Sequence, residues 1–262
     1  MATDNFIVKP NLQTENLYGI HPVFEAMKAG RRRFHEIYIA KEKIPLRLEP
    51  VMELAAKLRI PVKMVSRSRL GAMSGTELHQ GIGASVSQYP LAELSDILSG
   101  SKKMLQNTYF LILDSVEDPQ NLGALIRTAL CAGTSGIIIP KNRAASPTPA
   151  ASKASAGALE HAHITIVTNI VSTIQTLKQY GFWIVGTDMN ARESLFSIDL
   201  AFPTAVVIGS EGKGIRPLVK KNCDLLVSIP QCGPVSSLNA SAAGAVILYE
   251  VFRQRLINKK NR

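Results

Sequence analysis

The sequence predicts an α/β protein in two parts, and three observations lead to that prediction. Six nearly all-apolar runs follow one another from Tyr109 onward, with helical segments between them. Runs without polar alternation are typical of strands buried on both faces, as in a parallel sheet covered by helices. From Tyr18 to about Gln88 helix and strand patterns mix over shorter runs. A chain of 262 residues that is 46% apolar is long enough for two modest cores.

The first part predicts a small α/β unit, residues 16–88, behind a flexible tail of residues 1–15 that are polar and without period. Ile20, Val23, Phe24 and Met27 recur at helical spacing, and Gly30 ends that helix. The other predicted elements are a strand at 36–40, a helix at 48–59, a strand at 61–65, a helix at 67–75 and a strand at 81–86. Residues 89–105 are expected to form a connecting helix and linker.

The second part, residues 106–262, predicts a doubly wound sheet because strands and helices alternate along it. The strands are expected at 109–113, 136–140, 163–167, 182–186, 205–209 and 225–230. The helices are expected at 121–133, 147–160, 169–181 and 237–256.

Basic side chains outnumber acidic ones, and the formal net charge is +10. Residues 1–105 and residues 106–262 each carry 15 basic and 10 acidic side chains. Two basic surfaces predict a polyanionic partner, nucleic acid first, with a basic protein that binds no nucleic acid as the alternative. No apolar run approaches the roughly 20 residues of a membrane span, and the N-terminus shows no secretory signal. We therefore expect a cytoplasmic protein without a membrane partner.

The cysteines and histidines predict no metal centre. Cys131, Cys223 and Cys232 are odd in number and far apart, so they suit a reducing cytosol better than a disulfide framework or a metal site. His161 and His163 would share one face of a strand, but no third ligand lies near them.

Three turns of the second part carry polar residues where strands end, at the sheet edge at which ligands collect. In the first turn, Asp118 and Asn121 are candidate helix caps, and Gly123 admits close approach of another backbone. Arg127 follows one turn later. Taken alone, it could equally be a solvated side chain paired with Glu117 or Asp118.

The second turn brings Gly209, Gly212 and Gly214 close together. Its spacing matches neither a dinucleotide loop nor a triphosphate loop, and it is not a serine-hydrolase elbow. Glu211 among these glycines could accept a hydrogen bond from a ligand, or could favour a helix N-terminus.

The third turn, with Ser236, Ser237 and Asn239, precedes the longest predicted helix. A helix cap explains one of these residues. It does not explain the small residues from Ala240 to Gly244, because glycine costs about 1 kcal/mol inside a helix. Close approach of another segment or of a ligand accounts for them better.

In this order the three turns resemble the motifs of the SpoU (TrmH-type) branch of the SPOUT RNA 2′-O-ribose methyltransferases, over nearly all of residues 106–257. The first part resembles, less closely, the L30e-like RNA-binding domain that precedes the catalytic domain in bacterial 23S rRNA guanosine-2′-O-methyltransferases. The matching residues are Asn121, Gly123, Ala124, Arg127 and Ala129, then Gly209, Ser210, Glu211, Gly212 and Gly214, then Ile229, Pro230, Gly233, Ser236, Ser237, Leu238, Asn239, Ser241 and Ala242.

The resemblance implies a SPOUT parallel sheet with a deep trefoil knot, an exception to the unknotted rule. It also implies an S-adenosylmethionine site in the knot and a homodimer with the active site at its interface. The implied catalytic residues are Arg127, Glu211, Ser237 and Asn239. The implied cofactor-binding residues are Ile208, Gly209, Ser210, Gly214, Ile229, Gln231, Ser236 and Leu238. Gln231 and Ala240 depart from the larger apolar residues that relatives often carry, so the expected pocket is more polar and roomier.

The expected reaction is in-line attack of a ribose 2′-oxygen on the sulfonium methyl, which selects RNA over DNA. Asn121 and Arg127 are expected to contact RNA. We expect Arg127 to bind the target phosphate and stabilise the developing alkoxide rather than act as base, because a guanidinium stays charged. Arg31, Arg32 and Arg33 are the expected RNA contacts of the first part, with a solubilising loop as the alternative.

The expected substrate is a guanosine of 23S rRNA. One alternative is a methyltransferase of guanosine 18 in tRNA, whose relatives usually lack so complete a leading domain. Another is a non-catalytic RNA-binding, ribosome-associated protein, which would have no need of Arg127, Glu211 and Asn239 together. A dinucleotide-dependent dehydrogenase is less favoured, because no Gly-x-Gly-x-x-Gly follows the first strand of the second part.

Overall fold

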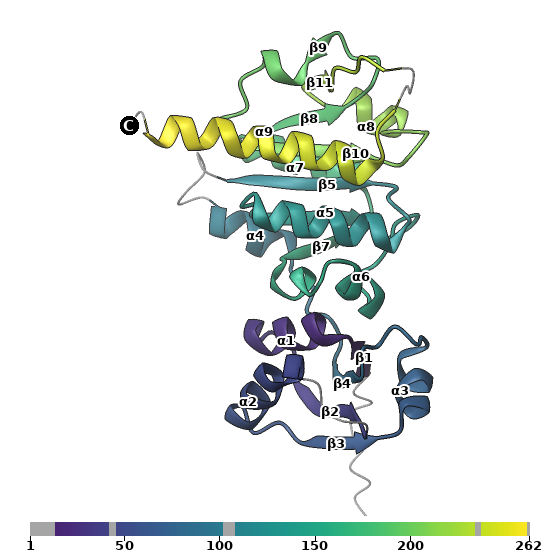
Figure 1. Cartoon of the computed structure of the whole chain (residues 1–262). Coiled ribbons are helices and arrows are strands. Elements are labelled where there is room, and N and C mark those ends of the chain that lie inside the picture. The colour runs from purple at the N-terminus through teal and green to yellow at the C-terminus, as the bar shows by residue number, and fades with distance from the viewer. Residues whose placement is uncertain (1–13, 42–45, 102–107, 234–236, 261–262) are drawn as a thin grey trace, which may run out of the picture. The chain divides into compact units, whose positions relative to one another are not determined.

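The computed structural model describes residues 14–41, 46–101, 108–233 and 237–260 (Figure 1). The chain divides into two compact units, Met1–Tyr89 and Pro90–Arg262. Each unit combines one sheet with helices, so the predicted α/β class is confirmed.

The smaller unit contains a four-stranded sheet in the order β1-β4-β2-β3. Its strands are β1 (Thr14–Tyr18), β2 (Phe34–Ala40), β3 (Val62–Val65) and β4 (Ile82–Ser87). β4 runs antiparallel to both neighbours, and β2 and β3 run parallel. Its helices are α1 (Ile20–Ala29), α2 (Glu49–Lys57) and α3 (Arg67–Ser74), so every element predicted in this part is present.

Strand β1 was not predicted, and it corrects the expected tail. Thr14 and Glu15, assigned to that tail, pair through the backbone with Ser87 and Val86 of β4. Leu17 is the only fully buried side chain of this strand. The strand is therefore held by backbone pairing, and its side chains show no apolar alternation from which it could be predicted. The rest of the predicted tail, residues 1–13, lies outside the described part.

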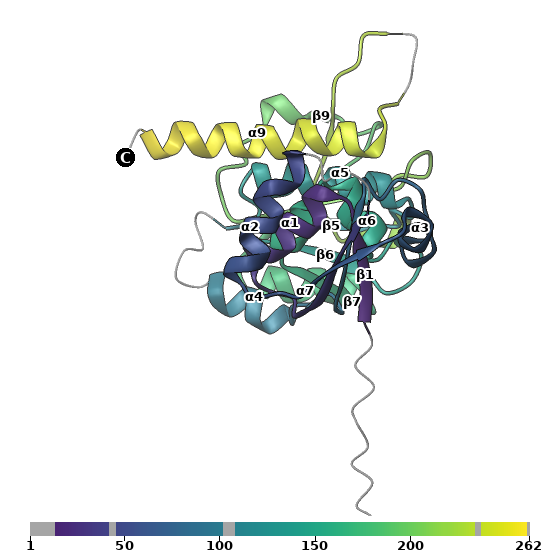
Figure 2. The same ribbon diagram turned by 60° about the horizontal axis from the view of Figure 1, so that its bottom comes forward.

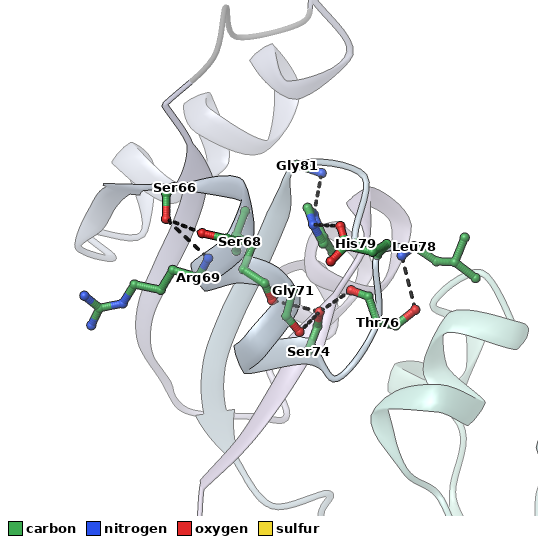
Figure 3. A network of polar contacts seen from close by, with 11 residues as sticks. Ser66, Ser68, Arg69, Gly71, Ser74, Thr76, Leu78, His79 and Gly81 are labelled. Atoms are coloured by element: carbon green, nitrogen blue, oxygen red, sulfur yellow. Dashed lines mark hydrogen bonds and ion pairs between the residues drawn. The ribbon is translucent and has the colours of Figure 1, made fainter.

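A polar network holds α3 and the turn that follows it (Figure 3). Ser66 caps the helix by accepting a hydrogen bond from the Arg69 backbone N–H at 3.3 Å. The Ser74 hydroxyl lies 2.8 Å from the carbonyl oxygens of both Leu70 and Thr76. Leu70 is the buried apolar anchor of the helix. Because α3 has so little apolar surface, these side-chain contacts set the path of the chain into β4.

The three consecutive arginines that were predicted to contact RNA have different environments, and the prediction is corrected for Arg32. The side chain of Arg32 is 1% exposed and lies 2.5 Å from the Glu15 carboxylate and 3.2 Å from the Ser87 carbonyl oxygen. Arg31 lies over the ring of Tyr89, and Arg33 is exposed. Arg32 is therefore a structural residue that fastens β1 to β4, and it is not available as an RNA contact.

The larger unit contains a seven-stranded, all-parallel sheet in the order β7-β6-β5-β10-β8-β11-β9, as expected for this part. The strands are β5 (Tyr109–Asp114), β6 (Gly136–Pro140), β7 (Ile164–Val167), β8 (Trp183–Thr187), β9 (Glu193–Ser194), β10 (Thr204–Gly209) and β11 (Leu225–Ser228). From β5 the chain continues to β6 and β7 on one side, and it later places β10 on the other. The boundary between β5 and β10 is therefore the switch point of the sheet, where ligands bind in such folds.

Helices cover both faces of this sheet. On one face, Leu98 of α4 (Leu94–Ser101) and Ile174 of α7 (Ile170–Gln179) belong to the same buried cluster as Phe110 and Ile112 of β5. α5 (Pro119–Cys131) and α9 (Ala240–Lys260) lie side by side on the other face (Figures 1 and 2). Because side chains of a strand point alternately to the two faces, β5 needs apolar residues throughout.

Glycines permit the closest helix contacts. A Cβ at Gly244 on α9 would lie 2.1 Å from Cδ2 of Leu125 on α5 and 3.0 Å from Cδ1 of Ile208 on β10. A Cβ at Gly123 would lie 2.5 Å from the Cβ of Ala154 on α6 (Pro149–Ala154). The expectation that another segment approaches these small residues is confirmed.

Some predicted details differ. Residues 89–105 are not only a connection: Leu94, Ile97 and Leu98 of α4 pack into the core of the larger unit, while residues 102–107 lie outside the described part. His161 ends a 3₁₀ turn (Ala158–His161) instead of lying on a strand. Two short elements, β9 and α8 (Pro217–Lys221), were not predicted because each is too short to show a period. No described helix combines the length and apolarity of a membrane span.

Arg32 and Arg33 provide a matched test of the smaller unit. Arg32→Ala removes a buried cation and leaves Glu15 without it, so we expect a loss of about 2 kcal/mol in the free energy of unfolding. Arg33→Ala changes an exposed side chain and is expected to change the stability by less than about 0.5 kcal/mol. Urea unfolding of both full-length variants measures the difference; equal stabilities would contradict the structural role of Arg32.

Candidate active site

A cleft of about 520 Å³ opens where β8, β10 and β11 end. The turns after β10 and β11 supply most of its lining, as expected from parallel strands whose carboxyl ends share one edge. Of the predicted cofactor residues, those that line it are Ile208, Gly209, Ser210, Gly214, Ile229, Gln231 and Leu238. The predicted catalytic residues Glu211 and Ser237 also line it. Ser236 lies outside the described residues.

Asn239 joins the three predicted turns. Its Nδ2 donates a hydrogen bond to Oδ1 of Asn121 at 3.0 Å and also contacts Oε1 of Glu211. Its Oδ1 accepts hydrogen bonds from the backbone N–H of Ser241 at 2.8 Å and of Ala242 at 3.3 Å. Asn239 is thus the cap of α9. It also links α9 to Asn121, which lies 118 positions earlier in the sequence, and to Glu211, which lies 28 positions earlier.

The turn after β10 is a tight loop that requires glycine. Gly214 has a φ of +61°, and its backbone exchanges hydrogen bonds with Ser210 at 2.9 and 3.2 Å. A Cβ at Gly209 would lie 2.0 Å from the carbonyl carbon of Gly214. The loop therefore folds back onto the end of β10, and it presents Ser210 and Glu211 to the cleft.

An ion pair between a buried carboxylate and an exposed arginine, which the sequence did not reveal, fixes the other end of this turn. Asp114 is completely buried at the end of β5. Its carboxylate accepts hydrogen bonds from the backbone N–H of Arg216 at 2.8 Å and from Nε of Arg216 at 2.7 Å. The one available signal was an aspartate directly after an apolar strand.

The turn after β8 forms a further wall of the cleft and was also missed. Asp188, Met189 and Asn190 line it, and Asp188 forms an ion pair with Lys220. The Asp188 backbone N–H donates to the Val227 carbonyl oxygen on β11 at 2.9 Å. The turn has no glycine pattern, but its place after a parallel strand could have identified it.

Arg127 does not reach the cleft of its own chain. It is exposed on α5, six positions beyond Asn121, and it lines neither of the two clefts at this edge. Asp118 caps α5 by accepting from the Gln120 and Asn121 backbone N–H groups. In the described ranges Arg127 has no hydrogen bond or ion pair, so the expected alternative of a pair with Glu117 or Asp118 is not formed.

The cleft suits an organic cofactor of mixed polarity. Its volume lies within the range of small-molecule sites, roughly 300–1,000 Å³. Ile208 and Leu238 supply apolar surface, and Gln231 and Ser237 supply hydrogen-bonding groups. Among the described residues, no cluster of three His, Cys, Asp or Glu side chains offers a metal site.

Family models match both units. The model of the SpoU rRNA Methylase family matches residues 108–249, and the model for RNA 2′-O ribose methyltransferase substrate binding matches residues 17–92.

Relatives cover nearly the whole chain. A protein of Bacillus subtilis described as a putative TrmH family tRNA/rRNA methyltransferase is 42% identical over 93% of this chain and 97% of its own. The 23S rRNA (guanosine-2′-O-)-methyltransferase RlmB of Coxiella burnetii is 41% identical over 92% of this chain and 96% of its own. The SpoU methyltransferase AviRb of Streptomyces viridochromogenes, solved in complex with AdoMet, has a similar structure, with a TM-score of 0.78. The match covers 97% of this chain and 95% of AviRb, at 25% sequence identity. The chain therefore belongs to the SpoU rRNA methylase family.

Proposed function

We propose that this chain transfers a methyl group from S-adenosylmethionine to the ribose 2′-hydroxyl of a guanosine in 23S rRNA. The convergence of the three motif turns on Asn239, beside a cleft of cofactor size, carries the proposal. The names of the RlmB relatives at 38–41% identity support the reaction and the substrate. The net charge of +10 suits an RNA partner, and the cytoplasm is where such a substrate is made.

We assign different roles in cofactor binding to the residues of the cleft. Gly209, Ile229 and Leu238 would hold the cofactor through their backbone, and Ile208, Ser210, Gly214 and Gln231 would complete its surroundings. The bound cofactor supplies an activated methyl group, so the protein has to position the ribose and accept its proton. Ser237 and Glu211 line this cleft and Asn239 contacts Glu211, so we assign to these three residues the orientation of the target nucleotide. We also expect the trefoil knot of the family in this C-terminal segment.

Arg127 serves the reaction from a second copy of the chain. Within its own chain it reaches neither cleft, yet its motif position matches the family's catalytic arginine. A homodimer that sets α5 of one copy against the cleft of the other brings the guanidinium to the ribose. There it binds the target phosphate and stabilises the developing alkoxide, and it keeps its charge.

Mixed dimers test whether the site is shared. Arg127→Ala and Asn239→Ala are each expected to be inactive alone. Random assortment of the two variants gives half heterodimers, each with one intact site, so co-expression is expected to restore about 25% of wild-type activity. Co-expression of Arg127→Ala with the double variant is the control and is expected to restore none. A mixture as inactive as its components would place both residues in one chain's site.

Mapping of 2′-O-methyl nucleotides tests the function itself. Mass spectrometry of RNA from a deletion strain is expected to show the loss of one 2′-O-methylguanosine from 23S rRNA, which wild-type protein restores and Asn239→Ala does not. Loss from tRNA alone would replace the rRNA proposal with the tRNA alternative. Unchanged methylation of both RNAs would favour a non-catalytic RNA-binding protein.

A further inference from the structure

A second cleft, of about 460 Å³, opens at the same edge of the sheet. It lies between the turns that follow β5, β6 and β10. The two clefts have five lining residues in common: Ser210, Glu211, Lys213, Gly214 and Ala240. The turn after β10 is therefore the partition between them, and a molecule in one cleft lies next to a molecule in the other.

Two residues of the second cleft have a left-handed backbone conformation. Ser115 has a φ of +65° and Arg143 has a φ of +55°, although neither is glycine. Left-handed backbone is disfavoured for residues with a side chain, and such residues cluster at binding and catalytic sites. The Ala145 N–H donates a hydrogen bond to the Val116 carbonyl oxygen at 2.8 Å, which holds the two turns together. This hydrogen bond and the two left-handed residues together define this wall of the cleft.

Arg143 is one of the cations in the lining of this cleft. Its side chain is exposed, and it forms no hydrogen bond or ion pair with any residue in the described ranges. Three carboxylates belong to the same lining: Asp118 caps α5, Glu211 contacts Asn239, and Glu117 forms no ion pair with Arg143. The other arginine of the lining, Arg216, is tied to the buried Asp114. Arg143 is thus held in a strained conformation, and no described carboxylate pairs with it.

We infer that the second cleft takes the RNA nucleotide whose ribose is methylated, and that Arg143 binds one of the two phosphates that flank it, while Arg127 of the second copy binds the other. The inference rests on the proposed function, because it places the acceptor beside the cofactor cleft. The volume is within the range of small-molecule sites, roughly 300–1,000 Å³. A guanidinium matches a phosphate with two parallel hydrogen bonds, which fixes the direction of the nucleotide as well as its affinity. The ribose is then directed toward the partition of Ser210 and Glu211.

The test compares Arg143→Ala with Arg143→Lys and with Lys141→Ala. Lys141 is exposed two positions away and lines neither cleft, so it is the matched control. Binding and methylation are measured on 23S rRNA from a deletion strain. Arg143→Ala is expected to raise the KM and the Kd for RNA about tenfold or more, and to lower the salt slope of binding by about one. Calorimetry with S-adenosylmethionine is expected to show unchanged affinity. Arg143→Lys is expected to keep the salt slope and recover part of the affinity, and Lys141→Ala is expected to stay within about twofold of the wild-type KM.

Arg143→Gly separates binding from folding. Glycine adopts a φ of +55° without strain, so this variant is expected to melt at or above the wild-type temperature while it loses as much RNA affinity as Arg143→Ala. Wild-type RNA binding by both variants would overturn the inference, as would a parallel loss of S-adenosylmethionine affinity and thermal stability. If the wild-type protein methylated no RNA, the proposed function would fail, and the RNA affinities of the same variants would still decide whether Arg143 binds phosphate.

Discussion

The amide of Asn239 is the constraint on which the site depends. It donates to Asn121 and Glu211 and accepts from the N–H groups of Ser241 and Ala242, so its donor and acceptor ends are both used. These partners also decide which end is nitrogen, because backbone N–H groups cannot accept. An aspartate could still cap α9, but it could not donate to Asn121 and would repel Glu211. One side chain therefore ties the start of α9 to both other turns.

The sheet explains why two clefts adjoin. β5 and β10 pair in parallel with Gly209 opposite Asp114, so their carboxyl ends stop at the same level. The turn after β10 is closed by Gly214 and pinned at Arg216 by the buried Asp114. It stands as a partition between the first cleft and the second. With the proposed methyl donor in the first cleft and the proposed acceptor in the second, the two reactants are neighbours at this turn, and such positioning lowers the entropic cost of the transfer.

Much of this arrangement follows from sequence patterns, and the failures have physical causes. Buried parallel strands need apolar residues on both faces, so the strands of the larger unit were predictable, as were the turns around Gly209 and Asn239. Strand β1 was missed because pairing with β4 depends on backbone groups and only Leu17 is fully buried. Arg32 was misassigned because a run of arginines does not show which member finds a buried carboxylate. The Asp114 pair spans 102 residues, which no local pattern reports.

Hydrogen exchange with and without S-adenosylmethionine tests the central claim most directly. If the cofactor binds among the turns after β8, β10 and β11, saturating S-adenosylmethionine slows amide exchange in residues 187–190, 208–215 and 237–243. Bound ligand lowers the population of locally opened states in the segments that it contacts. The smaller unit, residues 14–89, keeps its exchange rates. Unchanged exchange in these three segments, or protection confined to the smaller unit, would contradict a cofactor site built from the turns after β8, β10 and β11.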